Sequence, residues 1–312
     1  MRSATHTFRH VCAVVLICAA AVSAQQQKGG GPPLPESVRQ AQQLMRDGKT
    51  GEALALYRQA VQATPDSVPV LNAAGIAFDL AGQYAEARKY FAKSIEVAPD
   101  AARKAAQQRS MAMSYAFEGN CKETLKYEQM VIDYYASTGD FFQQGEIANE
   151  AARVCIESGD LDAAAKWYKT GHDVGLKQPD IPQDRKDLWE FRWEHAQARI
   201  AARRGNKAEA QRHVAAAKAI LEKDPKMTPD QAPFFPYLTG YVALYTGDYK
   251  TALEELLKAN QNDAFIQCLI GQTYEKLGDK EKALEYYRKA SATTGHNAPA
   301  AFARPFTRKK LG

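Results

Sequence analysis

The chain has 312 residues, of which 45% are hydrophobic and 25% charged, with a net charge of +5 at pH 7. This composition is typical of a globular protein and not of a disordered chain. No run of Lys and Arg is long enough to follow a phosphate backbone, so we expect no nucleic acid partner.

Residues 1–24 are predicted to form a signal peptide. Arg2 and Arg9 give a positive start, and the apolar stretch 11–22 has about half the length that a bilayer span requires. Small residues then precede a cleavage site after Ala24. Cleavage removes two Arg and no acid, so the net charge of +5 falls to +3. We expect a periplasmic or secreted protein without a membrane span; the alternative is an anchor that is retained.

The mature chain is predicted to begin with a flexible linker and to continue as an all-α fold. Residues 25–35 are mostly Gln, Gly and Pro, which form no core. Long Ala-rich amphipathic stretches follow, separated by short Gly or Pro breaks, and no alternating strand pattern occurs. The expected helix pairs are 36–47 with 50–63, 67–80 with 84–97, 101–118 with 121–136, 140–157 with 161–175, 183–204 with 207–222, 231–245 with 249–260, and 263–276 with 280–293.

A short sequence motif recurs between the two helices of each pair: Gly, four residues, then Ala or Thr. It begins at Gly48, Gly82, Gly119, Gly159, Gly205, Gly247 and Gly278. The Gly is expected to end one helix in a left-handed conformation, and the small residue to lie where the second helix approaches the first. A spacing near 34 residues is typical of a solenoid of helix pairs.

These repeats resemble the tetratricopeptide repeat family over residues 36–295. In the second pair the residues at the packing positions of the family are Leu71, Ala74, Gly75, Phe78, Ala87, Phe91 and Pro99. In the last pair they are Ile270, Gly271, Tyr274, Ala283, Tyr287 and Ala290. The resemblance implies a right-handed superhelical solenoid of about seven antiparallel helix pairs. Residues 296–312 are too short for another pair and are expected to be a tail or a cap on the last helix.

The sequence predicts no catalytic, metal or cofactor site. The four His of the mature chain, His172, His195, His213 and His296, are spread over the fourth pair, the two helices of the fifth pair and the tail, and no H-E-x-x-H or G-x-S-x-G motif occurs. Among the three remaining cysteines, Cys121 and Cys155 are expected near one edge of the array. A disulfide between them is therefore feasible, and two separate thiols are the alternative.

The resemblance also implies which residues line the concave groove, because the first helix of each pair faces it in this family. Carried over to the fourth pair, these positions include Asn149 and Arg153. The fifth pair contributes a basic stripe, and the sixth contributes an aromatic stripe at helical spacing. These two stripes consist of Arg192, His195, Arg199 and Arg203, and of Phe234, Tyr237, Tyr241 and Tyr245. We expect the four rings to be partly exposed in the groove; the alternative is that they are core.

These observations favour an exported, non-catalytic scaffold whose groove binds a protein or peptide segment. Aromatic rings beside guanidinium groups suit a ligand with apolar and acidic parts, such as an acidic or C-terminal peptide. The alternatives are an envelope saccharide as ligand, an enzyme or accessory subunit with a site assembled across repeats, and a self-associating array whose groove holds its own tail. The sequence does not set the oligomeric state.

Overall fold

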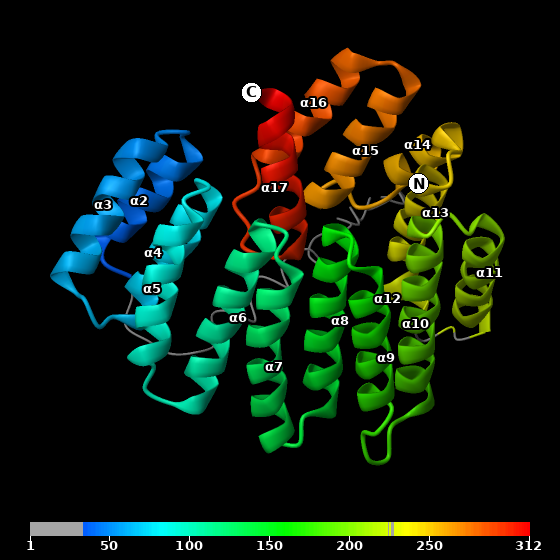
Figure 1. Cartoon of the computed structure of the whole chain (residues 1–312), viewed down its shortest axis with the longest axis horizontal. Coiled ribbons are helices and arrows are strands. Elements are labelled where there is room, and N and C mark those ends of the chain that lie inside the picture. The colour runs from blue at the N-terminus through cyan, green and yellow to red at the C-terminus, as the bar shows by residue number, and fades with distance from the viewer. Residues whose placement is uncertain (1–33, 224, 226–227) are drawn as a thin grey trace, which may run out of the picture. The chain divides into compact units, whose positions relative to one another are not determined.

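The computed structural model describes residues 34–223, 225 and 228–312, and all regular structure in this part of the chain is helical (Figure 1). The predicted signal peptide and residues 25–33 of the predicted linker lie outside it. The helices are α2 (Glu36–Arg46), α3 (Thr50–Ala63), α4 (Val68–Leu80), α5 (Tyr84–Glu96), α6 (Ala101–Phe117), α7 (Cys121–Ser137), α8 (Phe141–Ser158), α9 (Leu161–Gly175), α10 (Gln183–Arg203), α11 (Lys207–Lys223), α12 (Thr228–Gln231), α13 (Phe235–Tyr245), α14 (Tyr249–Lys258), α15 (Ala264–Leu277), α16 (Lys280–Ser291) and α17 (Ala298–Leu311).

Consecutive helices pack as the predicted pairs. Each first helix contacts the second helix of its pair, and each second helix contacts the following pair (Figure 1). The predicted all-α solenoid of helix pairs is therefore confirmed. Buried side chains lie between neighbouring pairs along the whole array, as expected when each pair covers the apolar face of the next.

The repeated Gly residues adopt the predicted left-handed conformation, with φ between 67° and 91° at all seven positions. Only Gly takes this conformation without a steric cost from a side chain. The residue after the Gly often begins the next helix. After Gly159, for example, the side chain of Asp160 accepts a hydrogen bond of 3.0 Å from the backbone N–H of Ala163 and so satisfies one of the free donors of the helix start.

The small residue of each Gly-containing motif is buried where two helices meet, as predicted. All seven are at most 3% exposed: Ala53, Ala87, Thr124, Ala164, Ala210, Ala252 and Ala283. The opposing helix supplies a small residue as well. A Cβ atom at Gly75 would lie 2.5 Å from the ring of Phe91, so the aromatic ring fits only because Gly has no side chain.

The sixth pair differs from the prediction, which placed one helix over 231–245. The chain instead forms the short α12, a 3₁₀ turn at Ala232–Phe234, and then α13. Pro233 and Pro236 lack the N–H that a continuous helix would need. Phe234 therefore lies in the turn and not on the aromatic stripe.

The C-terminal segment forms a long helix that does more than cap α16. The helix α17 contacts α16 and α15, and it also contacts α6 and α8 (Figure 1). Arg304 Nη2 and Arg308 Nη2 both donate to the carbonyl of Leu80, at 2.7 and 3.1 Å. His296 Nε2 lies 2.8 Å from Asp79 Oδ2 in a buried pair. The tail thus connects the last pair with the second and third pairs.

Candidate functional site

The first helices of the fourth, fifth and sixth pairs meet at the carboxylate of Glu157. Its Oε1 accepts a hydrogen bond from Tyr241 Oη (2.8 Å), and its Oε2 accepts one from Arg203 Nη1 (3.0 Å). Arg203 Nη1 also donates to Tyr241 Oη at 3.1 Å, and its guanidinium lies 4.7 Å from the ring centre of Tyr245. Burial raises the pKa of Glu157, while Arg203 and the Tyr241 hydroxyl oppose that rise. Three predicted site residues, Arg203, Tyr241 and Tyr245, are therefore brought together.

A second group of predicted residues surrounds Arg199, which is 5% exposed. Its Nη2 donates to the hydroxyl of Tyr168 at 2.7 Å, and its guanidinium lies 6.0 Å from the ring centre of Tyr237. Tyr237 stacks on His195 with ring centres 5.6 Å apart. Burial, and then the charges of Arg199 and Arg153, lower the pKa of His195 well below its ordinary value. The imidazole is therefore neutral at pH 7.

The expectation of partly exposed rings is wrong for Tyr237 and Tyr241, which are 7% and 0% exposed. Their burial comes from residues of α8, α10, α14 and α15 that form one apolar cluster, including Ile156, Ile200 and Leu256. The array brings α8, α10, α13 and α15 close together here, and long Arg and Tyr side chains fill the space between them. Phe234, by contrast, is 52% exposed.

Three other predicted residues have separate surroundings. Arg192 forms an ion pair with Glu146. Asn149 lies at the contact with α9, because its side-chain oxygen would be 2.5 Å from a Cβ atom at Gly171. Arg153 points toward α17, where its guanidinium lies 6.0 Å from the ring centre of Phe302. Of the three, only Arg153 belongs with the groove residues around Glu157 and Arg199.

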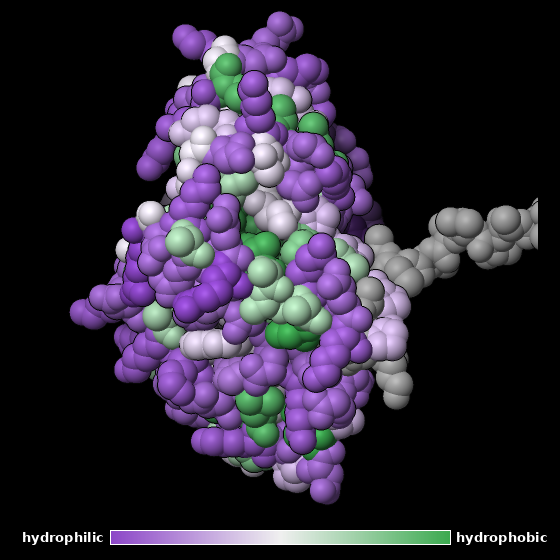
Figure 2. Space-filling model, turned by 90° about the vertical axis from the view of Figure 1, so that its right-hand side faces the viewer, coloured by the Kyte–Doolittle hydropathy of each residue, from purple (hydrophilic) through white to green (hydrophobic). Residues whose placement is uncertain are grey.

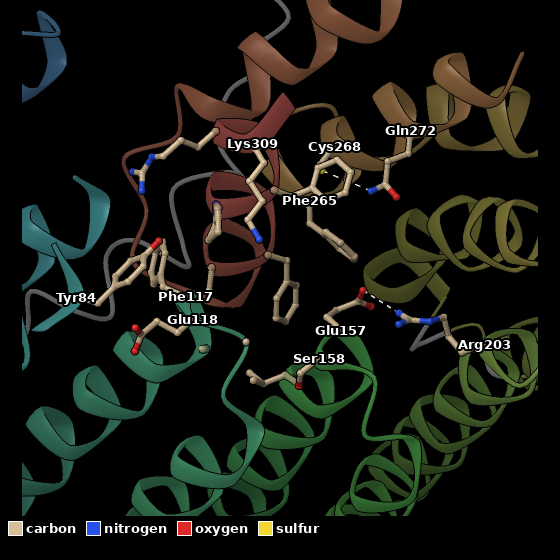
Figure 3. A pocket seen from close by; sticks show the side chains of 18 of the residues that line it. Tyr84, Phe117, Glu118, Glu157, Ser158, Arg203, Phe265, Cys268, Gln272 and Lys309 are labelled. Carbon is tan, nitrogen blue, oxygen red and sulfur yellow. Dashed lines mark hydrogen bonds and ion pairs between the residues drawn. The ribbon is translucent and has the colours of Figure 1, made fainter. Parts of the chain in front are cut away.

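A cavity of about 660 Å³ remains between these helices and α17 (Figure 3). We call it the central pocket. Aromatic rings supply much of its wall: Tyr84, Phe117, Tyr245, Phe265, Phe302 and Phe306. Glu157 and Arg203 stand on one side of it, and Glu118 and Lys309 on others (Figure 3). A cavity of this size, apolar with a few polar groups, suits a small ligand or a short segment of a larger one.

The charges of the central pocket are unevenly matched. Glu157 is paired with Arg203, and Glu118 is paired with Arg88. Arg308 donates to the backbone carbonyl of Leu80. Lys309 is exposed and extends toward the cavity, and no acid of the described residues forms an ion pair with it. The pocket therefore carries an excess of positive charge, supplied by α17.

Sequence reasoning missed the side of the pocket that α17 provides. The motif NAPAAFARPF carried a usable signal: Asn297 accepts a hydrogen bond from the N–H of Ala300, and Pro299 stands in the first turn. Pro305 within the segment argued against a helix of this length. Phe302 and Phe306, both on α17, line the pocket.

The face of the molecule in Figure 2 is mostly hydrophilic, with hydrophobic residues gathered near its middle. Leu221, Ala232 and Phe235 line a separate hollow between α11 and α13. Within the described part of the chain, no helix is both long and apolar enough to cross a membrane, and no group of three or more His, Cys, Asp or Glu side chains could hold a metal ion.

The disulfide between Cys121 and Cys155 is present, with the two Cα atoms 4.9 Å apart. It joins the start of α7 to the end of α8, two residues before Glu157. Cys268 is a buried free thiol that lines the central pocket. Burial raises its pKa to about 12, so it is unreactive as a nucleophile.

Comparisons with known proteins agree with this architecture. The tetratricopeptide repeat family matches residues 44–109 and again residues 266–292. No curated protein matches the sequence. Among solved structures, the apo form of RapI superposes with a TM-score of 0.52 at 11% identity, over 88% of this chain and 97% of that one. A tetratricopeptide repeat protein of Parabacteroides merdae gives 0.48 at 14% identity, over 88% and 96%.

These matches fall on the second pair and its flanks and on the last pair, which are the stretches that follow the family pattern most closely. RapI shows a likeness of fold alone. Together with the helix pairs and their left-handed Gly turns, the two family matches support one conclusion: this is a tetratricopeptide repeat protein, with repeats of the family matched at residues 44–109 and 266–292.

Proposed function

We propose that this chain is an exported, non-catalytic scaffold that binds a segment of another polypeptide in the central pocket. The observation that carries the proposal is the pocket itself, a cavity of about 660 Å³ walled by six aromatic rings from five helices. Aromatic rings bind peptide side chains with a large contact area and a small loss of conformational entropy. Export to the periplasm or beyond the cell is proposed from the predicted signal peptide.

The ligand that fits best has an apolar side chain and a nearby carboxylate. The rings of Phe117, Phe265 and Phe302 would contact the apolar part. Lys309 would pair with the carboxylate, since it is exposed and extends toward the cavity. An acidic peptide or the C-terminal end of a protein has this chemistry. In this proposal Arg203 and Tyr245 line the site, whereas Tyr237 and Tyr241 support it from behind.

A charge reversal on α17 tests the proposal. Acidic and neutral fluorescent peptides of equal length, each with one Phe, would be titrated into the mature chain and followed by fluorescence anisotropy. We expect the acidic peptides to bind more tightly, and Lys309→Glu to weaken that binding about tenfold. Lys280→Glu, the same change at an exposed position of α16, is the matched control. Equal binding by both variants and by both peptide sets would contradict the proposal.

A further inference from the structure

The groove contains more buried positive charge than its acids neutralise. Arg153, Arg199 and Arg203 lie around one acid, Glu157, both of whose oxygens already accept hydrogen bonds from Arg203 and Tyr241. Glu150, the other acid near Arg153, accepts two hydrogen bonds of 2.7 Å from Arg109. Within the described residues, neither Arg153 nor Arg199 forms an ion pair with an acid. Two cations are therefore left without a counter-charge.

Arg199 has most of its hydrogen-bonding capacity unused. The guanidinium has five N–H donors. In the described part of the chain these donors form hydrogen bonds only to the hydroxyl of Tyr168, at 2.7 Å, and to the carbonyl of His195, at 3.4 Å. The side chain is nevertheless buried, and an uncompensated buried charge is strongly unfavourable. His195 is neutral and adds no negative charge.

The hydroxyl of Tyr237 is a further donor without an acceptor. Tyr237 is 7% exposed, and its Oη has no hydrogen-bond partner in the described structure. Its ring lies 6.0 Å from the guanidinium of Arg199, and the charges of Arg199 and Arg153 both lower the pKa of its hydroxyl, against the rise that burial causes. A buried hydroxyl is rarely left unpaired in a native protein.

We propose that Arg153, Arg199 and Tyr237 form a buried site for a small oxyanion: phosphate, sulfate or a carboxylate. We call these three residues the oxyanion cluster. A guanidinium group pairs two oxygens of such an ion at once, and the Tyr237 hydroxyl would donate a third hydrogen bond. The ion would compensate the charges of Arg199, which is buried, and of Arg153, which is partly buried. Because Arg199 and Tyr237 are both more than nine-tenths buried, the site suits a free ion of a few atoms better than the end of a chain.

The oxyanion cluster lies behind one wall of the central pocket. Phe302 faces Arg153, and Phe265 packs edge-on against Tyr237 with ring centres 6.4 Å apart. The two Phe rings contact each other, with centres 5.1 Å apart. An ion would therefore enter from the pocket past this ring pair. The inference does not depend on the polypeptide ligand proposed above, since the unpaired donors are present whatever the pocket binds.

Anion titrations of the mature chain test the site. Thermal unfolding would be followed at low millimolar phosphate, sulfate or acetate, with chloride at matched ionic strength as reference. We expect a saturable rise in melting temperature with at least one oxyanion. Tyr237→Phe and Arg199→Gln should each raise the apparent dissociation constant about tenfold or more, because each removes a charge-assisted hydrogen bond.

Two comparisons make the test specific. In chloride alone, Tyr237→Phe should melt no lower than the parent, since it removes only an unpaired buried hydroxyl. Tyr287→Phe is the matched control. The hydroxyl of the buried Tyr287 donates to Glu275 at 2.6 Å, so loss of this hydroxyl should lower the melting temperature but leave the oxyanion response intact. The site is overturned if the melting temperatures of the parent and Tyr237→Phe respond equally to every oxyanion. A general salt effect, or an ordered water at Tyr237, would give that result.

A further titration distinguishes a free ion from a polypeptide carboxylate as the ligand. It follows the melting temperature with the peptide acetyl-Ala-Phe, either as the free acid or as the C-terminal amide. A Tyr237-dependent rise with phosphate or sulfate supports a free ion. The melting temperature could instead rise only with the free-acid peptide, and not with the amide or the inorganic ions. If that rise depends on Tyr237, it supports the oxyanion cluster with a polypeptide carboxylate as its ligand. The first result can occur while the Lys309 test fails, so the two proposals stand or fall separately.

Discussion

Raising the pH should destabilise the third and fourth helix pairs, because Glu128 must be protonated in the folded chain. Its side chain is 0% exposed, and no N–H or O–H group of the described residues donates to either of its oxygens. A protonated Glu128 can itself donate a hydrogen bond to Glu150. Burial, and then the negative charge of Glu150, raise the pKa of Glu128 well above its ordinary value. Glu150 stays ionised because Arg109 binds both of its oxygens at 2.7 Å.

The sign and size of the effect follow from proton linkage. In the unfolded chain Glu128 titrates near 4.5, so below that pH both states are protonated and the full stability is present. Between 4.5 and the raised pKa, the folded state holds one proton more than the unfolded state. The free energy of unfolding then falls by about 1.4 kcal/mol per pH unit from this residue.

Urea unfolding at a series of pH values, followed by circular dichroism, measures this slope. Glu128→Gln has no charge, and its amide can donate to Glu150. We expect its slope to be shallower than that of the parent by about 1.4 kcal/mol per pH unit, and the variant to be the more stable protein at alkaline pH. Glu96→Gln, an exposed change on α5, should keep the parental slope. Parallel slopes for the parent and Glu128→Gln would refute the protonated buried Glu128.

Three further outcomes are expected. Ala87→Leu should lower the free energy of unfolding by about 1–3 kcal/mol, because Ala87 is 0% exposed between two helices; an unchanged urea midpoint would count against that packing. Changing Cys121 and Cys155 together to Ser should cost about 4 kcal/mol, the entropy of closing a loop of 34 residues; non-reducing peptide mapping and urea unfolding check the bond and its effect. Mass spectrometry of the exported protein should show Gln25 as the first residue, and retention of residues 1–24 would disprove the cleavage.

The helix pairs could be predicted closely because their signals are local. A Gly that ends one helix and an Asp or Asn that begins the next are neighbours in sequence, as at Gly159 and Asp160. The burial of the Ala residues could be predicted from the same sequence motif. The predicted helix bounds were wrong where local signals conflicted. Pro233 and Pro236 interrupt the first helix of the sixth pair, and α17 forms although Pro305 lies within it.

The burial of the groove could not be predicted in the same way. Tyr241 and Glu157 are 84 residues apart and meet because α8 and α13 approach each other in the array. The docking of α17 on α6 and α8 is likewise a long-range contact. Periodicity identifies which residues share a face of one helix, but it does not say how far that face is covered by others. The chemical types at the site were predicted, and their exposure was not.

Photo-crosslinking from inside the central pocket tests the proposed function most directly. A benzophenone amino acid at Gln272, which lines the pocket on α15, would be compared with the same group at Lys280 on α16, in cells that export the chain. We predict that polypeptides crosslink at position 272 and not at 280, and that an acidic peptide found by anisotropy competes with them. Equal crosslinking from both positions, or none at 272 that the peptide can displace, would contradict a polypeptide ligand in the pocket.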